Sequence, residues 1–185
     1  VRLQAGGTFL LNALKLQKRN STKTPAHVIA LNKVAELKGI EMKGEALIIK
    51  SMTTIDELFD SALLKDNFKI LHTVCRNIST QPIRNMATVG GNLTCRYTWT
   101  EMPAAMTGLK ARLHFVGKDG TAEELGCSEF FQNAAKTDKI LTHVSIPLDK
   151  KATIAYRRVK KTQYVDIPLL SLMINTHLVN GAFSD

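Results

Sequence analysis

The sequence predicts an α+β fold, in which strands and helices are mixed rather than arranged as regular βαβ units. Strand-like and helix-like periods follow one another irregularly, and short turns that favour hairpins recur along the chain. The chain has 185 residues, of which 44% are hydrophobic, so it can bury an ordinary core. These observations argue against a doubly wound parallel sheet and against a disordered chain.

The N-terminal part of the chain predicts a strand, a helix and a second strand. Residues 2–5 form the first strand, and a helix is expected from Thr8 because leucines recur behind it at helical spacing. The Thr8 side chain is the expected N-cap. The polar residues 20–25 predict a loop, residues 26–31 a strand, and residues 34–37 a turn or short helix.

A hairpin and a division of the chain are predicted next. Residues 39–42 form one strand and residues 46–49 the return strand, because Lys43-Gly44-Glu45 is typical of a hairpin turn. We place a soft boundary near residue 43. It separates a small N-terminal subdomain, residues 1–43, from a larger one, residues 44–185.

The larger subdomain predicts several helices around further strands. Residues 53–58 begin a helix, because a threonine followed three residues later by an acidic side chain approximates a capping box. Residues 68–78 carry a helical period, and residues 102–111 are a helix with a proline in its first turn. Residues 112–116 form a strand that ends at a glycine-rich turn, and residues 127–133 form a short helix.

Three strands complete the predicted order. Residues 140–146 and 152–159 form two of them, and we expect these two to pair across the turn between them. Residues 169–179 form the third. No internal repeat, low-complexity tract or long linker interrupts this pattern.

Two double-glycine segments are the strongest indication of function. Ala5-Gly6-Gly7-Thr8 follows a strand and precedes a helix, and the run from Ile83 to Asn92 contains a second pair, Gly90-Gly91. Glycine has no Cβ, so a backbone can approach a ligand closely at these points. Free N–H groups in such turns can bind an anion, above all where a helix starts. Two such turns can hold one long ligand with a pyrophosphate in its middle, although neither matches a dinucleotide fingerprint or a P-loop.

A net charge of +9 leaves several kinds of partner open. Basic residues cluster at 15–23, 150–151 and 157–161. Such clusters suit nucleic acid, an anionic cofactor or an acidic partner subunit, or they are solvated faces. Three tyrosines and one tryptophan are few for stacking on single strands. We expect no nucleic acid, because net charge alone supports it.

Cysteines, histidines and apolar runs mainly exclude functions. Cys75, Cys95 and Cys127 are odd in number and widely spaced, which predicts small buried or half-buried thiols in the reducing cytoplasm. The five histidines lack metal-ligand spacing, so no metal site is expected. No apolar run predicts a membrane span, and no signal peptide is expected. The chain lacks an initial methionine and ends in a turn, so we expect a fragment of a longer protein.

The second glycine segment resembles the signature of the FAD-binding subunit or domain of molybdenum hydroxylases. That family includes xanthine dehydrogenases and aerobic carbon monoxide dehydrogenases. The resemblance lies in the run Ile83-Arg84-Asn85-Met86-Ala87-Thr88-Val89-Gly90-Gly91-Asn92-Leu93. The first glycine segment is similar to the family's first FAD loop. Further similarities follow in order along essentially the whole chain, at 49–54, 102–105, 140–147, 156–159 and 166–167.

The resemblance implies a fold and a set of FAD-binding residues. The fold is the two-subdomain α+β fold of molybdopterin dehydrogenases (PCMH-type), with FAD between the subdomains and without the C-terminal domain that follows in the family. Backbone amides of the first loop would wrap the pyrophosphate, at Leu3, Gln4, Ala5, Gly6, Gly7, Thr8, Phe9 and Leu10. The second loop would supply a hydroxyl and close backbone contact, at Thr88, Val89, Gly90, Gly91 and Asn92. Leu141 would line the flavin site, Glu101 stands where the family has an aspartate, and Arg157 takes the place of a family basic residue.

The function that the resemblance implies is electron transfer through a flavin. The chain would take electrons from a [2Fe–2S] subunit and pass them to NAD⁺, a quinone or O₂, with NAD⁺ favoured. A molybdopterin-binding subunit of the same complex would bind the hydroxylated substrate. No residue of this chain is expected to be catalytic, because the flavin performs the redox chemistry.

Several residues depart from the family's pattern and support a rival hypothesis. Phe9 stands where an acidic or polar residue is common, Lys50 and Ser51 replace glycine and alanine, and Glu101 replaces aspartate. Residues 96–99 are bulkier than the family's small-residue stretch. The alternative is therefore a non-catalytic, flavin-free paralogue that acts as an assembly or scaffold module.

Overall fold

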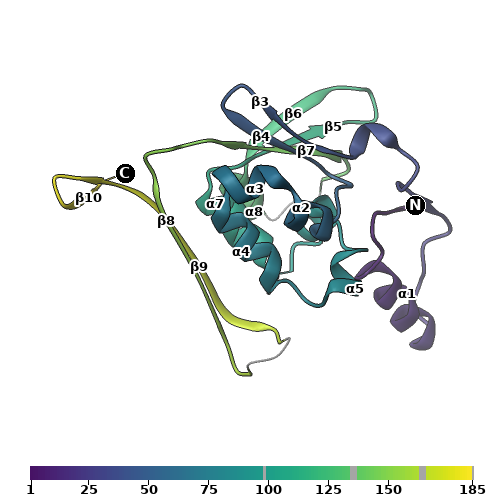
Figure 1. The fold of residues 1–185 in the computed structure, drawn as a ribbon. Helices are drawn as coiled ribbons and strands as arrows, with labels where there is room; N and C mark the ends of the chain where they lie inside the picture. The colour runs from purple at the N-terminus through teal and green to yellow at the C-terminus, as the bar shows by residue number, and fades with distance from the viewer. Residues whose placement is uncertain (98, 134–136, 163–165, 185) are drawn as a thin grey trace.

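A computed structural model describes residues 1–97, 99–133, 137–162 and 166–184. The described residues form an α+β fold, as predicted, with three sheets and with helices gathered beneath the largest one (Figure 1). The strands are β1 (Arg2–Gln4), β2 (Val28–Ala30), β3 (Ile40–Lys43), β4 (Ala46–Lys50), β5 (Arg112–Val116), β6 (Ala122–Gly126), β7 (Ile140–Pro147), β8 (Thr153–Lys160), β9 (Pro168–Val179) and β10 (Ala182–Ser184). The helices are α1 (Leu10–Arg19), the 3₁₀ helix η1 (Ala35–Leu37), α2 (Ile55–Asp60), α3 (Ala62–Asn67), α4 (Lys69–Asn77), α5 (Gln81–Arg84), α6 (Val89–Thr94), α7 (Glu101–Gly108) and α8 (Cys127–Gln132).

The largest sheet has five antiparallel strands in the order β3-β4-β7-β5-β6. Successive side chains of a strand point to opposite faces, so one face of this sheet can be apolar and the other polar. Leu47, Leu113 and Val144 are fully buried in the core that the sheet shares with the helices. Lys50 and His143, which are next in the strands to buried residues, are only partly buried. The sheet and helices form what we call the main body.

The helices of the main body follow their sequence signals closely. The predicted capping box is present at α2, where the Thr54 hydroxyl accepts from the Glu57 amide at 3.1 Å and the Glu57 carboxylate accepts from the Thr54 amide at 2.7 Å. The helical period at 68–78 is confirmed by α4, which buries Leu71, Val74 and Cys75. The main body is therefore well specified by local signals.

Residues 2–30 form a small N-terminal unit beside the main body. Strand β1 pairs in parallel with β2, and α1 connects them. No residue of α1 is buried, and all three residues of β2 are exposed. The prediction that Thr8 caps this helix is wrong. The helix begins at Leu10, and Phe9 before it already has helical dihedrals (φ −96°, ψ −46°), so no side chain accepts at the N-cap.

The predicted hairpin between the two subdomains is present. Strands β3 and β4 pair in antiparallel fashion, with Lys43 opposite Ala46. The predicted division into residues 1–43 and 44–185 falls in the turn of this hairpin, and it stays a prediction. Contacts with the main body begin earlier in the chain, because Leu37 is buried and its carbonyl accepts from the Met52 amide at 2.7 Å.

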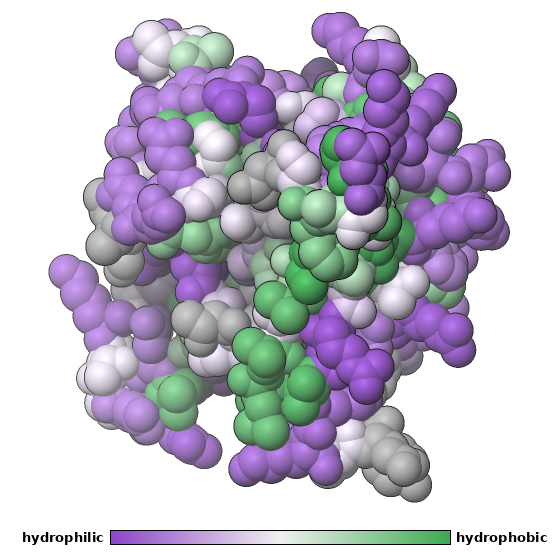
Figure 2. All heavy atoms as spheres, turned by 90° about the vertical axis from the view of Figure 1, so that its left-hand side faces the viewer, coloured by the Kyte–Doolittle hydropathy of each residue, from purple (hydrophilic) through white to green (hydrophobic). Residues whose placement is uncertain are grey.

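Strands β8, β9 and β10 form a separate antiparallel sheet, in which β8 and β9 run beside the helices of the main body (Figure 1). The expected pairing of residues 140–146 with 152–159 is wrong, because β7 is already paired with β4 at one edge and β5 at the other. Strand β8 pairs with β9 instead. One face of this ribbon packs on the core, and the other exposes apolar side chains that gather on the side shown in Figure 2, namely Val159, Leu170, Leu172 and Ile174.

The three cysteines are free thiols with a structural role. Cys75 and Cys127 are buried, as predicted, and burial raises the pKa of their thiols to about 12 and about 11. Cys95 is partly buried, and burial raises the pKa of its thiol as well. Within the described residues, no helix has both the length and the apolar character that a membrane crossing requires.

Candidate functional site

The two double-glycine segments lie against each other in the structure. A Cβ at Gly6 would overlap the carbonyl oxygen of Met86 and lie 2.6 Å from its carbonyl carbon. A Cβ at Gly91 would lie 3.5 Å from the Cβ of Ala5. At Gly6 only glycine allows this approach, because a side chain would force the two backbones apart. The small N-terminal unit and the main body thus each contribute one loop to a single place, which we call the paired glycine loops.

The first loop presents a run of unused backbone amides. None of the six N–H groups from Ala5 to Leu10 donates a hydrogen bond to a described residue. Gly7 has φ +75°, a conformation that glycine adopts without the usual steric cost. Helix α1 starts at the end of this run, so its dipole adds positive potential there. This combination favours an anion such as a phosphate.

The second loop uses its amides within the fold. The Thr88 hydroxyl caps α6 by accepting from the Gly91 amide at 3.1 Å. The Val89 amide donates to the Thr53 carbonyl at 2.9 Å, and the Gly90 amide donates to the Ser51 carbonyl at 2.8 Å. A Cβ at Gly90 would lie 2.7 Å from the Ser51 Cβ. The close backbone approach at this loop is therefore an approach to the segment that follows strand β4.

Buried polar atoms without partners lie beside the second loop. The Asn92 Oδ1 and the Ser51 Oγ are buried and have no hydrogen-bond partner among the described residues. Leaving such an atom unpaired costs about 1–3 kcal/mol, so native proteins usually provide a partner. The Thr88 hydroxyl also keeps its own proton for donation, because no described residue accepts it. These groups suit the polar part of a ligand held between the loops.

An ion pair that the sequence did not predict holds the segment that leads into the second loop. The Arg84 guanidinium lies 3.1 Å from the Asp56 carboxylate, and both side chains are largely buried. Arg84 also donates to the Ile78 carbonyl at 3.3 Å and lies over the Phe59 ring. Arg84 ends helix α5, two residues before Met86. The ion pair therefore fixes the segment that carries the Met86 carbonyl, which lies against Gly6. Only the folded structure shows that Asp56 is the partner of Arg84.

The remaining predicted residues are not all at the paired glycine loops. Leu3 and Gln4 belong to β1 and pair with β2, just before the open amides. Leu141 is buried on β7, next to Thr142, whose carbonyl accepts from the Ser51 amide at 2.9 Å. It therefore lies beneath the second loop.

Glu101 and Arg157 are engaged elsewhere. The Glu101 carboxylate forms a buried ion pair with Arg158 at 2.8 Å, and burial raises the pKa of Glu101 although Arg158 opposes this shift. Arg157 is exposed on the outer face of β8. In Figure 1 strand β8 lies on the opposite side of the helices from β1 and α1. Contact between these two residues and the cofactor stays a prediction.

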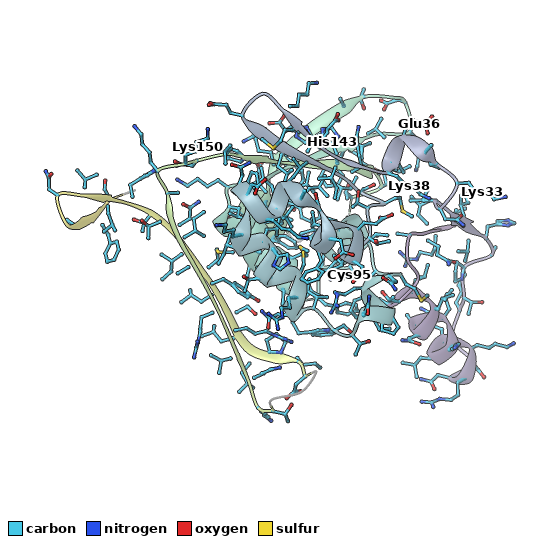
Figure 3. All side chains as sticks on the ribbon, viewed as in Figure 1. Lys33, Glu36, Lys38, Cys95, His143 and Lys150 are labelled. Carbon is cyan, nitrogen blue, oxygen red and sulfur yellow. The ribbon has the colours of Figure 1, made fainter. Side chains whose placement is uncertain are left out.

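The surroundings of the first loop are strongly basic. Residues 1–38 contain a single acidic side chain, Glu36, and their basic side chains are Arg2, Lys15, Lys18, Arg19, Lys23, Lys33 and Lys38. Lys33 and Lys38 flank Glu36 near the N-terminal unit, as Figure 3 shows. Cys95, also labelled there, ends helix α6 and donates from its thiol to the Asn92 carbonyl at 3.0 Å. A dianionic group would be attracted to this side of the molecule.

The fold and the paired glycine loops define an α+β protein that binds an extended, anionic nucleotide cofactor. Comparison with known proteins identifies the cofactor. Residues 1–149 match the family model described as the FAD-binding domain in molybdopterin dehydrogenase. The carbon monoxide dehydrogenase medium chain of Afipia carboxidovorans is 30% identical over 162 residues, which cover 85% of this chain and 54% of that protein. The xanthine dehydrogenase FAD-binding subunit of Escherichia coli O157:H7 is 26% identical, over 100% of this chain and 64% of that protein.

A solved structure shows the same fold. It is a carbon monoxide dehydrogenase from Hydrogenophaga pseudoflava that lacks the Mo-pyranopterin moiety of its molybdenum cofactor. Its TM-score to this chain is 0.89 at 23% identity, covering 99% of this chain and 63% of that one. The chain thus spans between about half and two thirds of the length of its relatives.

The chain belongs to the family of FAD-binding domains of molybdopterin dehydrogenases, and its cofactor is FAD. The fold class and the family implied by the sequence are thereby confirmed. The residues at the paired glycine loops fit this cofactor. Its pyrophosphate matches the open amides, and its hydroxyl groups and ring nitrogens match the unpaired polar atoms.

Proposed function

We propose that this chain carries the FAD of a molybdenum hydroxylase and passes electrons from a [2Fe–2S] partner to NAD⁺ or another acceptor. When bound, FAD supplies the redox chemistry, and the chain supplies binding and orientation. A molybdopterin-binding subunit of the same complex would bind the hydroxylated substrate. The free cysteines are consistent with a reducing compartment, and we propose the cytoplasm.

The observation that carries this proposal is the run of six open amides from Ala5 to Leu10 beside the second glycine loop. We propose that these amides hold the pyrophosphate and that Thr88, Asn92 and Ser51 bind other polar groups of FAD. The loops come from the small unit and the main body, so a ligand held by both also fastens the two together. No side chain here needs to act as acid or base.

The variety of the relatives supports a substrate site on another subunit. Similar chains are named after carbon monoxide, glyceraldehyde, caffeine and nicotinate dehydrogenases. Chemically unrelated substrates with one shared FAD-binding domain indicate that the domain does not select the substrate. We therefore assign this chain the electron-transfer role only.

A second candidate function is a flavin-free assembly module. Two observations favour it. Phe9 brings a ring next to the open amides, and Glu101 is engaged by Arg158 rather than free to meet a cofactor.

Flavin retention separates the two functions. The purified chain, mixed with FAD and desalted, should show flavin absorbance. Gly91→Val should abolish it, because a Cβ there would lie 2.9 Å from the Thr88 hydroxyl and the two methyl groups beyond it would have to fit beside Ala5, whose Cβ is 3.5 Å from that Cβ. Lys118→Ala is the control, since that side chain is 81% exposed and pairs only with Asp138 among the described residues. A wild-type protein that stays colourless would favour the assembly module. Equal flavin content in the two variants would contradict the assignment of the glycine loops as the FAD site. Circular dichroism checks that both variants are folded.

A further inference from the structure

Three aromatic side chains form a continuous stack beside the first glycine loop. The Phe9 and Tyr97 ring centroids are 4.9 Å apart at 41°, and the Tyr97 and Trp99 centroids are 4.3 Å apart at 22°. These distances lie in the range of favourable aromatic pairs. The stack joins the start of α1 in the small unit to the segment after α6 in the main body. We call it the aromatic stack.

Backbone contacts hold the main-body half of this stack in place. Arg96, with φ +54°, reverses the chain after α6. Its guanidinium lies 4.6 Å from the Phe130 ring and donates to the Phe130 and Asn133 carbonyls, which fastens the turn to α8. The Thr100 hydroxyl and amide both donate to the Tyr97 carbonyl, at 2.9 and 3.3 Å. These contacts hold Arg96 and Thr100, the residues before Tyr97 and after Trp99.

The outer end of the aromatic stack is open. Trp99 is 38% exposed, and among the described residues only Tyr97 stacks on its ring. Tyr97 and Phe9 are partly buried behind it. An exposed tryptophan ring with two further rings stacked behind it can stack on a planar ligand. No aromatic ring of another described residue covers its outer face.

The position of the stack indicates what can occupy it. Phe9 supplies both a ring of the stack and one of the six open amides. A pyrophosphate on those amides therefore lies next to the stack. FAD carries a planar ring system on each side of its pyrophosphate, namely adenine and isoalloxazine. Either ring can reach a platform that begins within the phosphate-binding loop itself.

We propose that Trp99, backed by Tyr97 and Phe9, stacks on one planar ring of FAD. This proposal rests on the proposed function, because it requires FAD at the paired glycine loops. It gives Tyr97, Trp99 and Phe9, which lie where the chain departs from the family's pattern, a role in holding the cofactor. The Trp99 ring can stack on either ring of FAD, because stacking needs no specific hydrogen bonds. It would therefore add to the affinity for FAD that the pyrophosphate contacts provide.

The first test is the affinity for FAD of the full chain, measured by isothermal titration calorimetry. Trp99→Leu removes the ring and keeps an apolar side chain, so we expect FAD affinity to fall about 10-fold or more. Trp99→Phe should recover most of the loss, because it restores a smaller ring. The control is Phe183→Leu, which removes an aromatic ring that is 78% exposed on β10, far along the chain from the stack. It should leave the affinity unchanged.

Two further probes identify the ring. Trp99 is the one tryptophan of the chain, so its emission reports contact directly. If adenine stacks, ADP should quench Trp99 emission, and Trp99→Leu should weaken ADP binding. If isoalloxazine stacks, FMN binding should weaken instead, and the emission of bound flavin should rise in Trp99→Leu because the quenching ring is gone.

The outcomes separate this inference from the proposed function. Wild-type binding of FAD with equal affinity in Trp99→Leu, and with neither optical change, would overturn the stacking role and leave the glycine loops as the FAD site. No FAD binding by the wild type would overturn both. Circular dichroism and thermal melting check that Trp99→Leu is folded, and rescue by Trp99→Phe distinguishes stacking from a merely structural effect.

Discussion

The two glycine pairs share a sequence pattern but solve opposite physical problems. At Gly90 the backbone is packed against Ser51, the residue after β4, and the amides of residues 89–91 all donate within the main body. At Gly6 and Gly7 the backbone borders the open amides from Ala5 to Leu10. The amides of the second pair therefore serve the fold, and those of the first pair stay available as donors. Glycine is required in both pairs, because Gly6 and Gly90 lack room for a Cβ and Gly7 has a positive φ.

The comparison assigns packing mainly to the second loop and the pyrophosphate site to the first. The second loop belongs to the main body, whose core includes Val89 and Leu93. The first loop belongs to a small unit whose helix buries no residue. Damage at Gly90 should therefore reach the whole fold, and damage to the first loop should mainly reach FAD.

The largest expected effect is the loss of the fold at Gly90. In Gly90→Val the new Cβ would lie 2.7 Å from the Ser51 Cβ and 2.8 Å from its carbonyl oxygen. Backbone cannot move as a flexible side chain can, so we expect a loss of about 3 kcal/mol or more in the free energy of unfolding. Urea denaturation measures this loss. A fully stable Gly90→Val variant would contradict the packing role of the second loop.

The next effect is a loss of FAD at Gly6 without loss of the fold. In Gly6→Ala the methyl group would overlap the Met86 carbonyl and separate the two loops. We expect FAD affinity to fall about 100-fold, which corresponds to about 2.7 kcal/mol, because the open amides move away from the second loop. The urea midpoint should change little. Fluorescence titration with FAD measures the affinity, and a large fall in stability would blur the distinction between the loops.

Much of this arrangement could be predicted from the sequence, because its signals are local. The capping box at Thr54, the helix over 68–78 and the β3–β4 hairpin follow short-range patterns, whereas β6, α3, α5 and α6 were not predicted. The family signature marked both loops. The strand pairing could not be predicted in the same way, since it depends on which edges of β7 are already occupied.

Long-range contacts explain the other differences between prediction and structure. Glu101 and Arg158 are far apart in the sequence and meet only in the folded chain, and the same is true of Arg84 and Asp56, which are 28 positions apart. The unpaired Asn92 oxygen is visible only once its neighbours are in place. The Thr8 cap failed because Phe9 itself adopts helical dihedrals.

A smaller effect distinguishes two threonine caps. Thr88 caps α6 at the site, and Thr54 caps α2 in the main body, where the two residues form a bridge. Loss of a cap costs about 1 kcal/mol, so Thr88→Val and Thr54→Val should lose similar amounts of unfolding free energy. Only Thr88→Val should also weaken FAD binding, because only that hydroxyl faces the paired loops. Equal FAD affinity in the two variants would limit Thr88 to capping.

The smallest expected effect is a pH dependence of the free energy of unfolding, caused by His143 in the sheet near the second loop. Burial, His114, Lys50 and Lys43 lower the pKa of His143 from 6.5 to about 4. His143 lies opposite Lys50, the residue before Ser51. Between pH 6.5 and about pH 4 the unfolded chain binds a proton that the folded chain does not, so stability falls as the pH falls through this window.

Solvent screens this partly exposed ring, so we expect a loss of at most about 1 kcal/mol. Urea midpoints between pH 7 and pH 4 measure it, with His143→Gln as the control. The two proteins should converge in stability as the pH falls. If the stability of the two proteins changed with pH in the same way, His143 would not be the source of the pH dependence.

Residue-resolved amide hydrogen exchange tests the contrast between the loops most directly. In the free protein the amides from Ala5 to Leu10 should exchange rapidly, because no described residue accepts from them, while those of Val89, Gly90 and Gly91 should be protected. Addition of FAD should slow exchange at the first loop strongly and change the second loop little. Rapid exchange at Ala5–Leu10 that persists with FAD bound, or protection gained only at the second loop, would contradict the assignment of the pyrophosphate site.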